Sequence, residues 1–417
     1  MKKIITSALL IGALIFTGCQ NSADDDPPPP AQTPAGPEYT VTFAGSTIPA
    51  QKVAAWGKAA KPGTNPAAPA GAAFKGWYKD GRTPWDFDKD AVTENTTLCP
   101  GWTVSSIEAV GTFLGSAGAA GVSNSTARHM SAGTDPNPDK FPIPVAIAIQ
   151  LTTDNWKNLV KAIEGKGKKV SLDLSACTVG TQAGNAASTV AAEREVGGLW
   201  KDGKFQARDT GLTAAFTGSK NTLVTNTIAG IILPDAATEL VEATTNINLI
   251  HAIRGNNITK ISYAANASFH GGRLTEAYFP KITDIGTALE ECQYLEAAYL
   301  PEITALESSA LRYTYTPGAR GLMNVYIPKV TSIGDYAFGS SGKADLTITL
   351  GATPPVLGVK LFDAVTESKK ITVRVPAGSK AAYTDKWVEG LTGRGWSNGQ
   401  TLNGPLTRNF TVTILEY

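Results

Sequence analysis

A short apolar pattern that recurs along residues 274–338 constrains the fold of this 417-residue chain more than any other feature. Three segments begin at Leu274, Leu295 and Leu322, so their starts lie 21 and 27 residues apart. Each segment places apolar residues at offsets 0, +3 and +5, and again at +8 and +11. One such unit cannot bury its apolar side chains alone, so consecutive units must stack and share a core.

Less regular copies of the pattern extend the repeat in both directions. They lie at residues 169–174, 228–233, 258–263, 345–350 and 370–375. We therefore predict roughly seven rungs, with degenerate rungs at both ends. We also predict that the +3 and +5 side chains point into one core, as exemplified by Ile231, Leu233, Ile261, Leu300, Val325 and Ile327.

The spacing L-x-x-L-x-L within this period is typical of a leucine-rich repeat. The rung that contains Tyr326-Ile-Pro328 and Val330-Thr-Ser-Ile-Gly-Asp-Tyr-Ala-Phe338 resembles the BspA-like leucine-rich repeat family of bacterial surface proteins. The resemblance implies a solenoid with a parallel β-sheet on one face and irregular or short helical turns on the other. It also implies a non-catalytic interaction scaffold that is secreted or anchored at the surface.

The first residues are organised like a secretory signal. Lys2 and Lys3 precede an apolar stretch over Ile4–Phe16 that is too short to span a bilayer as a finished helix. The junction Gly18-Cys19 resembles the bacterial lipoprotein signal, which implies removal of residues 1–18 and acylation of Cys19. An ordinary signal peptide with an incidental cysteine is the alternative.

Lipidation at Cys19 would decide where the protein resides. More than one acyl chain is enough for stable anchoring. We therefore expect the chain to be lipid-anchored to a membrane of the cell envelope and exposed at the outer surface. The polar, acidic and Pro-rich residues 19–37 favour an extended tether.

Residues 38–103 contain an ordered set of motifs. The set is V-x-F at Val41, F-x-G-W-Y at Phe74, and V-T-x-x-x-T-L-x-x-x-W ending at Trp102. It resembles the internalin-type B repeat, also called the Listeria–Bacteroides repeat, which implies a small β-grasp-like module. Aromatic residues of the module could form a sugar-stacking platform, but so small a unit has little else to bury. We therefore expect its aromatic side chains in the core: Trp77, Tyr78, Trp85 and Trp102.

Composition divides the remainder of the chain. Residues 104–140 are rich in Gly, Ala and Ser and are interpreted as a linker with a short helix near Ile107–Leu114. Residues 141–378 form the repeat domain, which we expect to open with a strand, a helix capped by Thr153-Asp154 and a second strand. Residues 180–222 interrupt the repeat as an insertion that is either a binding element or disordered.

Residues 379–417 are expected to close the repeat as a C-terminal cap. Ser379 is placed to N-cap a helix that runs through Trp387, and Phe410–Ile414 alternates like a terminal strand. The predicted fold class is therefore mainly β, with a small module followed by a capped solenoid.

The charge balance gives no reason to expect a nucleic-acid partner. Lys2 and Lys3 are the only charges in the first 18 residues, and without them 35 basic residues face 36 acidic ones. A nearly neutral chain offers no electrostatic footprint for nucleic acid.

The sequence also lacks recognisable catalytic chemistry. Its three histidines, His129, His251 and His270, lie in no H-E-x-x-H motif and beside no G-x-S-x-G motif, and no phosphate-binding glycine motif follows a strand. No C-x-x-C spacing exists, so we expect neither a metal nor a cofactor. Three of the four cysteines are expected to be buried free thiols: Cys99, Cys177 and Cys292.

Offset +4 of the repeat supplies the candidate ligand-binding residues. Strand side chains alternate faces, so this offset points away from the core. In three consecutive rungs it is Tyr278, Tyr299 and Tyr326, and parallel strands lie ~4.8 Å apart, so the rings should form a ladder. Aromatic residues also suit strands for stability alone, whereas a recognition surface would use their large rigid contact area.

The prediction from sequence is a surface-anchored, non-catalytic interaction or adhesion scaffold. Its expected partner is a host or bacterial surface protein or glycan, reached through the repeat domain. The alternative is a carbohydrate-binding lipoprotein of the cell envelope. A hydrolase with unrecognised catalytic residues is a third hypothesis, which the motif search disfavours.

Overall fold

The computed structural model describes a defined subset of the chain. The described residues are 38–119, 141–179, 200–201, 204–206, 228–241, 251–262, 274–314, 321–362, 370–392 and 411–417, except residues 152, 165 and 343. The predicted signal, Cys19, the tether and most of the insertion 180–222 therefore lie outside the described residues.

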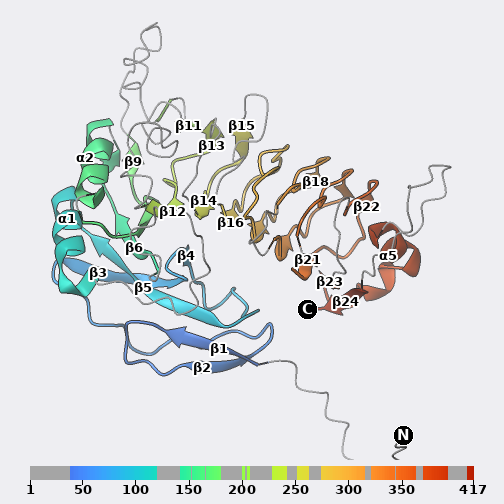
Figure 1. The fold of residues 1–417 in the computed structure, drawn as a ribbon, viewed down its shortest axis with the longest axis horizontal. Coiled ribbons are helices and arrows are strands. Elements are labelled where there is room, and N and C mark those ends of the chain that lie inside the picture. Colours follow the sequence, from blue (N-terminus) through green and yellow to red (C-terminus); the bar gives the residue numbers. More distant parts are fainter. Residues whose placement is uncertain are drawn as a thin grey trace, which may run out of the picture. The chain divides into compact units, whose positions relative to one another are not determined.

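One large sheet runs through the described chain (Figure 1). It has 15 strands, and every pairing from β5 to β24 along its main path is parallel. The predicted mainly β fold class is confirmed. In sheet order the strands are β2 (Gln51–Ala54), β1 (Glu38–Phe43), β5 (Thr96–Val104), β6 (Ile143–Ile147), β8 (Val170–Asp173), β12 (Ile228–Ile232), β14 (Ala252–Arg254), β16 (Glu276–Tyr278), β17 (Ala297–Tyr299), β19 (Asn324–Tyr326), β21 (Leu346–Thr349), β23 (Lys370–Val375) and β24 (Thr411–Glu416), with β3 (Ala72–Lys79) and β4 (Thr83–Pro84) attached beside β5.

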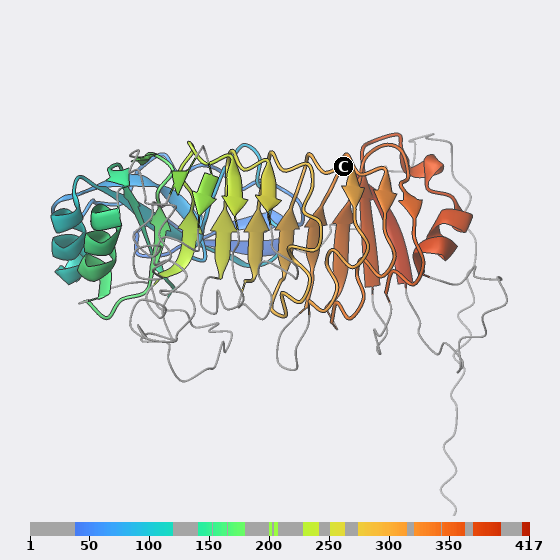
Figure 2. The ribbon, with the colours of Figure 1, turned by 90° about the horizontal axis from the view of Figure 1, so that it is seen from above.

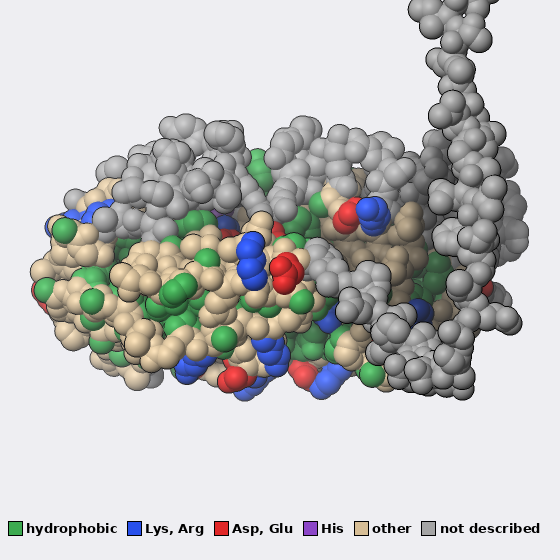
Figure 3. Space-filling view, turned by 90° about the horizontal axis from the view of Figure 1, so that it is seen from below, with side chains coloured by type: hydrophobic (Ala, Val, Ile, Leu, Met, Phe, Trp, Pro, Cys, Tyr) green, Lys and Arg blue, Asp and Glu red, His purple; other side chains and the backbone are tan. Residues whose placement is uncertain are grey.

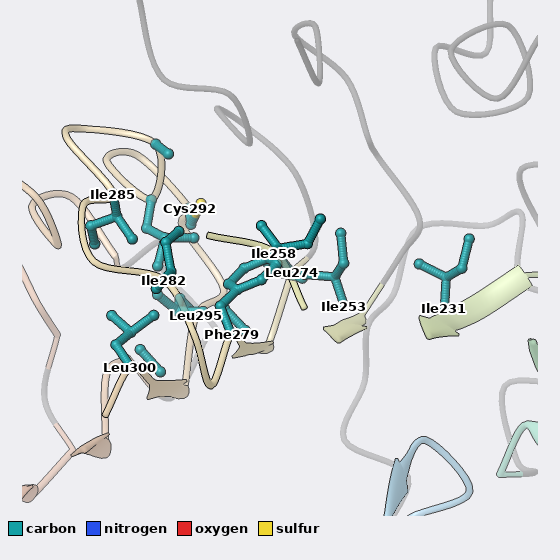
Figure 4. Close-up of a cluster of buried hydrophobic side chains, with 14 of the residues drawn as sticks. Ile231, Ile253, Ile258, Leu274, Phe279, Ile282, Ile285, Cys292, Leu295 and Leu300 are labelled. Atoms are coloured by element: carbon teal, nitrogen blue, oxygen red, sulfur yellow. The ribbon is translucent and has the colours of Figure 1, made fainter. Parts of the chain in front are cut away.

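The central residue of each repeat strand faces one continuous core. These residues lie opposite one another in register and are buried: Ile231, Ile253, Ala277, Ala298, Val325, Ile348 and Val373. Figure 4 shows how part of this core is filled from successive rungs. All six side chains predicted to share a core do so, and each is at most 4% exposed.

The rung predicted at 258–263 has a different register. Its sheet strand is β14, so Ile253 occupies the +3 position, and Ile258 and Ile261 occupy +8 and +11. Ile261 lies on β15 (Lys260–Ser262), outside the large sheet. The +5 position is Gly255, where a Cβ atom would lie 2.4 Å from Ile258 Cγ1. The pattern was misread because this rung lacks the large +5 residue.

Short strands line the other side of the rungs (Figure 2). They form sheets β10–β11–β13–β15, β18–β20–β22 and β7–β9. Their bounds are β10 (Trp200–Lys201), β11 (Lys204–Gln206), β13 (Glu239–Val241), β18 (Ala305–Leu306), β20 (Ser332–Ile333), β22 (Val356–Leu357), β7 (Gln150–Leu151) and β9 (Thr178–Val179). The described part of the insertion 180–222 therefore contributes two strands to this side.

A pair of helices covers the N-terminal end of the repeat core. Helix α1 (Ile107–Gly115) begins after Ser106, whose Oγ accepts a hydrogen bond from the Ala109 N–H at 3.1 Å. Phe113 and Leu114 of α1 are buried in the repeat core, and α1 packs against α2 (Thr153–Glu164). The short helix predicted near Ile107–Leu114 is thus confirmed as α1. Its placement in a linker is wrong, because its apolar side chains are buried in the repeat core.

The α-helix of the C-terminal cap begins later than predicted. Ser379 precedes a 3₁₀ turn, η4 (Lys380–Ala382), and makes no capping hydrogen bond through its side chain. Helix α5 (Asp385–Thr392) follows Thr384, whose Oγ1 accepts from the Trp387 N–H at 3.4 Å. A hydroxyl directly before the first helical turn is the better N-cap, so the prediction for Ser379 is wrong. The predicted terminal strand is present as β24.

A pair of single substitutions tests the register of the repeat. Val325 is 1% exposed, whereas its neighbour Asn324 lies half-buried on the opposite face. Val325→Asp should unfold the repeat domain, because an unpaired buried carboxylate costs several kcal/mol. Asn324→Asp should leave the thermal unfolding midpoint nearly unchanged, and equal midpoints for the two variants would contradict this register.

Candidate binding surface

The N-terminal module is joined to the repeat through its last strand. Trp102, Thr103 and Val104 of β5 pair with Val145, Ala146 and Ile147 of β6. Residues Glu38–Tyr417 accordingly form one compact unit. Module and repeat therefore share one sheet, a connection that the sequence did not indicate.

The aromatic residues of the module divide between its own core and its junction with the repeat. Trp77, Tyr78 and Trp102 are at most 5% exposed. Phe43 meets Trp77 edge-on at a centroid distance of 5.1 Å, and Trp85 is half-buried. The expectation of a module core is confirmed for Trp77, and Trp85 packs against that core. It is wrong for Trp102, which lies in the repeat core, and Tyr78 instead bonds to Asp173 of the repeat.

The end of β3 and the turn that follows it dock onto the repeat sheet, and we call this segment, residues 78–83, the docking turn. The Tyr78 hydroxyl donates to Asp173 Oδ2 at 3.0 Å, and Arg82 Nη1 donates to Thr275 Oγ1 at 3.0 Å. The Thr83 hydroxyl donates to a carboxylate oxygen of Glu276. We call the sheet surface that carries Asp173 and Glu276 the module face, because the module contacts it.

Burial and charge fix the protonation of the docking turn. Burial raises the pKa of Tyr78, and the negative Asp173 raises it further, so the hydroxyl remains a donor. Burial acts to lower the pKa of Lys79, but the carboxylates of Glu94 and Glu276 outweigh it and the net pKa is raised. The Lys79 ammonium therefore stays charged beside Glu94, at 3.2 Å.

Two glycines of the module provide a test of this docking. Gly81 has φ +66°, and a Cβ atom there would lie 2.1 Å from the Pro142 carbonyl oxygen. Gly71 has φ +76°, and no other atom lies within 4 Å of the place where its Cβ atom would be. Gly71→Ala should cost roughly 1 kcal/mol of unfolding free energy for the left-handed backbone alone. Gly81→Ala should cost roughly 3 kcal/mol or more, because the steric conflict adds to it.

Urea unfolding of both variants would measure the difference. Similar losses for Gly71→Ala and Gly81→Ala would mean that the turn does not need its close approach to Pro142.

The predicted tyrosine ladder is present on the module face. Tyr278 and Tyr299 stack at 4.4 Å with rings 3° apart, and Tyr299 and Tyr326 stack at 4.6 Å with rings 9° apart. The three residues pair directly across β16, β17 and β19, and each is half-buried rather than fully exposed. Burial raises the pKa of Tyr299, and its two tyrosine neighbours add to the shift, so its hydroxyl stays protonated.

Arginine residues extend the same cross-strand line at both ends. Arg254 precedes Tyr278 in the register, and its guanidinium carbon lies 3.8 Å from the Tyr278 ring centroid. Beyond Tyr326 the line continues through Thr349 to Arg374. We call this line the tyrosine–arginine row: Arg254, Tyr278, Tyr299, Tyr326, Thr349 and Arg374.

Arg374 joins the repeat to the module a second time. Its guanidinium carbon lies 3.8 Å from the Trp56 ring centroid and 4.7 Å from that of Tyr417. Trp56 belongs to the turn after β2 and has φ +68°, a left-handed conformation that few non-glycine residues adopt. The module thus contacts the module face beside the row through Asp173, Thr275 and Glu276, and the row itself at Arg374 through Trp56.

The sequence contained the signal for both arginines. Arg374 is at offset +4 of the rung that begins at Lys370, the offset that defines the ladder. Arg254 is at offset +4 once the register of its rung is corrected to place Ile253 at +3. The candidate site predicted from the sequence included only the aromatic residues at this offset, so it did not contain the two arginines.

The orientation of the rings determines what the row can recognise. Both faces of the inner ring, Tyr299, pack against neighbouring rings, and Tyr278 lies between Tyr299 and Arg254. The ring edges and hydroxyls are the parts left for a ligand. Such a surface favours hydrogen bonds and ionic contacts over the stacking of sugar rings.

The remaining candidate groups form no second site. Within the described residues no cluster of His, Cys, Asp and Glu has the arrangement of a metal site. Cys99, Cys177 and Cys292 are buried thiols outside any disulfide, as predicted, and burial raises the pKa of Cys177 to about 11. His129 and His270 lie outside the described residues. No described helix is long and apolar enough to cross a bilayer.

Comparison with known families identifies the module. Residues 39–99 match the family model of the Listeria-Bacteroides repeat domain, which confirms that part of the sequence interpretation. The match covers β1 to the first half of β5 and includes the docking turn. No curated protein and no solved structure gives a significant match to the chain.

Proposed function

We propose that this chain is a surface-anchored lipoprotein that acts as a non-catalytic interaction or adhesion scaffold. The tyrosine–arginine row carries the proposal, because it concentrates rigid aromatic and cationic contact groups on one line. Tyrosine and arginine are the residue types enriched at protein interfaces. The partner is a surface protein of a host or of a bacterium.

The module and the repeat support the same class of function. A Listeria-Bacteroides repeat is a surface-type domain, which fits a role in protein interaction. The repeat domain retains its sequence resemblance to BspA-like leucine-rich repeats, whose extended sheets serve as binding surfaces. The non-catalytic assignment rests on the absence of catalytic motifs from the sequence.

A protein partner is favoured over a glycan or a nucleic acid. Sugar recognition by aromatic residues uses free ring faces, whereas both faces of Tyr299 pack on rings and Tyr278 lies between Tyr299 and Arg254. On the face shown in Figure 3, basic and acidic side chains of the described residues lie next to one another. That face therefore has no extended basic patch of the kind that attracts nucleic acid.

A binding screen with two matched variants tests the proposal. Arrays of surface proteins and of glycans would be probed with the full chain in mild detergent. The variant with Phe at 278, 299 and 326 keeps the stack but lacks the hydroxyls, and should lose at least about tenfold in affinity for a protein hit. The variant with Ser at these positions should also lose roughly 1–3 kcal/mol of stability, because two stacked pairs disappear.

The screen can contradict the proposal in two ways. If both variants bind the selected protein as well as the natural chain does, the ladder has a structural role only. If the hits are exclusively glycans, the carbohydrate-binding alternative replaces the proposal.

The membrane anchor is a separate prediction. We propose acylation of Cys19 because the Lys2-Lys3 region, the apolar stretch and Gly18-Cys19 follow in the order of a lipoprotein signal. The natural chain should partition into the detergent phase, and Cys19→Ala should partition into the aqueous phase. Lipid-modified Cys19→Ala in the detergent phase would show that the anchor lies elsewhere.

A further inference from the structure

We propose that the tyrosine–arginine row binds an extended acidic peptide segment, whose carboxylates pair with Arg254 and Arg374 while its polar groups contact the tyrosine hydroxyls. This inference rests on the proposed function and names the chemistry of the partner. It uses the row as a linear site with a cation near each end.

The two arginines are held in place without an ionic partner. Arg254 stacks on Tyr278, and its Nε donates to Asn256 Oδ1 at 2.7 Å. Arg374 stacks between Trp56 and Tyr417. No carboxylate among the described residues lies within ion-pair distance of either guanidinium. Each is therefore a preorganised cation with no described carboxylate at ion-pair distance.

Partial burial makes an ionic interaction with Arg254 or Arg374 stronger than one with a fully exposed arginine. Both side chains are half-buried, and burial lowers the pKa of Arg374, so water compensates its charge incompletely. A carboxylate that arrives at such a site forms a charge-assisted hydrogen bond stronger than a neutral one. Charge complementarity thus selects an anionic partner.

The spacing of the row matches a short stretch of polypeptide. Arg254 and Arg374 are five strand steps apart, so the row is about 24 Å long at ~4.8 Å per step. An extended chain rises about 3.3 Å per residue, so roughly seven residues span it. The peptide would cross the strands rather than join the sheet as another strand.

The surroundings of the row tolerate acidic groups. The neighbouring line on the module face is Glu276, Ala297, Asn324, Thr347 and Thr372. Its one carboxylate, Glu276, already accepts from the Thr83 hydroxyl of the module. The rest of that line is neutral.

The module itself already places a carboxylate near the row. Asp90 is close enough for the positive Arg254 to act on its pKa, although burial dominates and raises that pKa. Asp90 also contributes to the raised pKa of Tyr299. Asp90 therefore lies near the part of the row between Arg254 and Tyr299, and burial favours its neutral form, which limits its repulsion of a partner's carboxylate.

The direct test measures binding of a defined acidic peptide to the full chain. The probe is a fluorescent, amidated octapeptide of alternating Glu and Thr. Its binding is measured by fluorescence anisotropy at low and at high salt. The variant that combines Arg254→Gln and Arg374→Gln should bind at least about tenfold more weakly and lose most of the salt dependence. The same octapeptide with Lys in place of Glu should not bind.

Arg312→Gln is the matched control. Arg312 also stacks on tyrosines, at 4.3 Å from Tyr313 and 5.1 Å from Tyr336, but it lies in the turn after β18 and outside the row. This variant should bind the acidic peptide normally. The variant that combines Arg254→Lys and Arg374→Lys retains both charges. It should therefore bind the peptide and keep the salt dependence, and this comparison remains available if the Gln variant does not fold.

The outcomes separate this inference from the proposed function. No binding of the acidic peptide, or equal losses in Arg312→Gln and the row variant, would overturn the inference. If a protein from the screen still binds in a tyrosine-dependent way, the proposed function stands without the acidic chemistry. Tighter binding of a galacturonate oligomer of equal charge would assign the row to an anionic glycan instead and overturn the peptide assignment.

Discussion

Parallel pairing without a register shift, from β12 to β24, is the constraint on which the rest of the described structure depends. Because residues at one offset lie directly opposite each other, each offset becomes a line across the sheet. One line is the apolar core that includes Val325, and another is the tyrosine–arginine row. A slip of one residue in any rung would exchange the two faces and destroy both lines.

Much of this arrangement could be predicted from the sequence because it repeats. The +3 and +5 residues of the three regular rungs identified the core, and offset +4 identified the tyrosine stack. The prediction failed where one residue departed from the pattern. Gly255 replaces a large apolar residue in its rung, since Phe279 of the next rung comes within 3.2 Å of the place of its side chain. The register of that rung was therefore misread, and Arg254 was missed with it.

The connection between module and repeat had no sequence signal of comparable strength. The pairing of β5 with β6 uses backbone groups, which every residue carries, so side-chain patterns do not reveal it. The docking turn is equally inconspicuous, because Gly81 and Arg82 are ordinary turn residues until Pro142 and Thr275 are brought beside them. Composition likewise placed the predicted helix at Ile107–Leu114 in a linker, whereas α1 caps the core. Ser379 was one of several hydroxyl residues before a helix. Contacts between distant segments decided each of these cases.

The two attachment points of the module also limit how the repeat can evolve. Tyr78 contacts Asp173 on β8, and Trp56 contacts Arg374 on β23, seven strand steps away along the sheet. At ~4.8 Å per step the module thus bridges about 34 Å of solenoid. Repeat proteins commonly change length by gaining or losing whole units, but a unit added between these contacts would pull Trp56 away from Arg374. The module therefore fixes the number of strands between β8 and β23. The repeat can gain units freely only outside that segment.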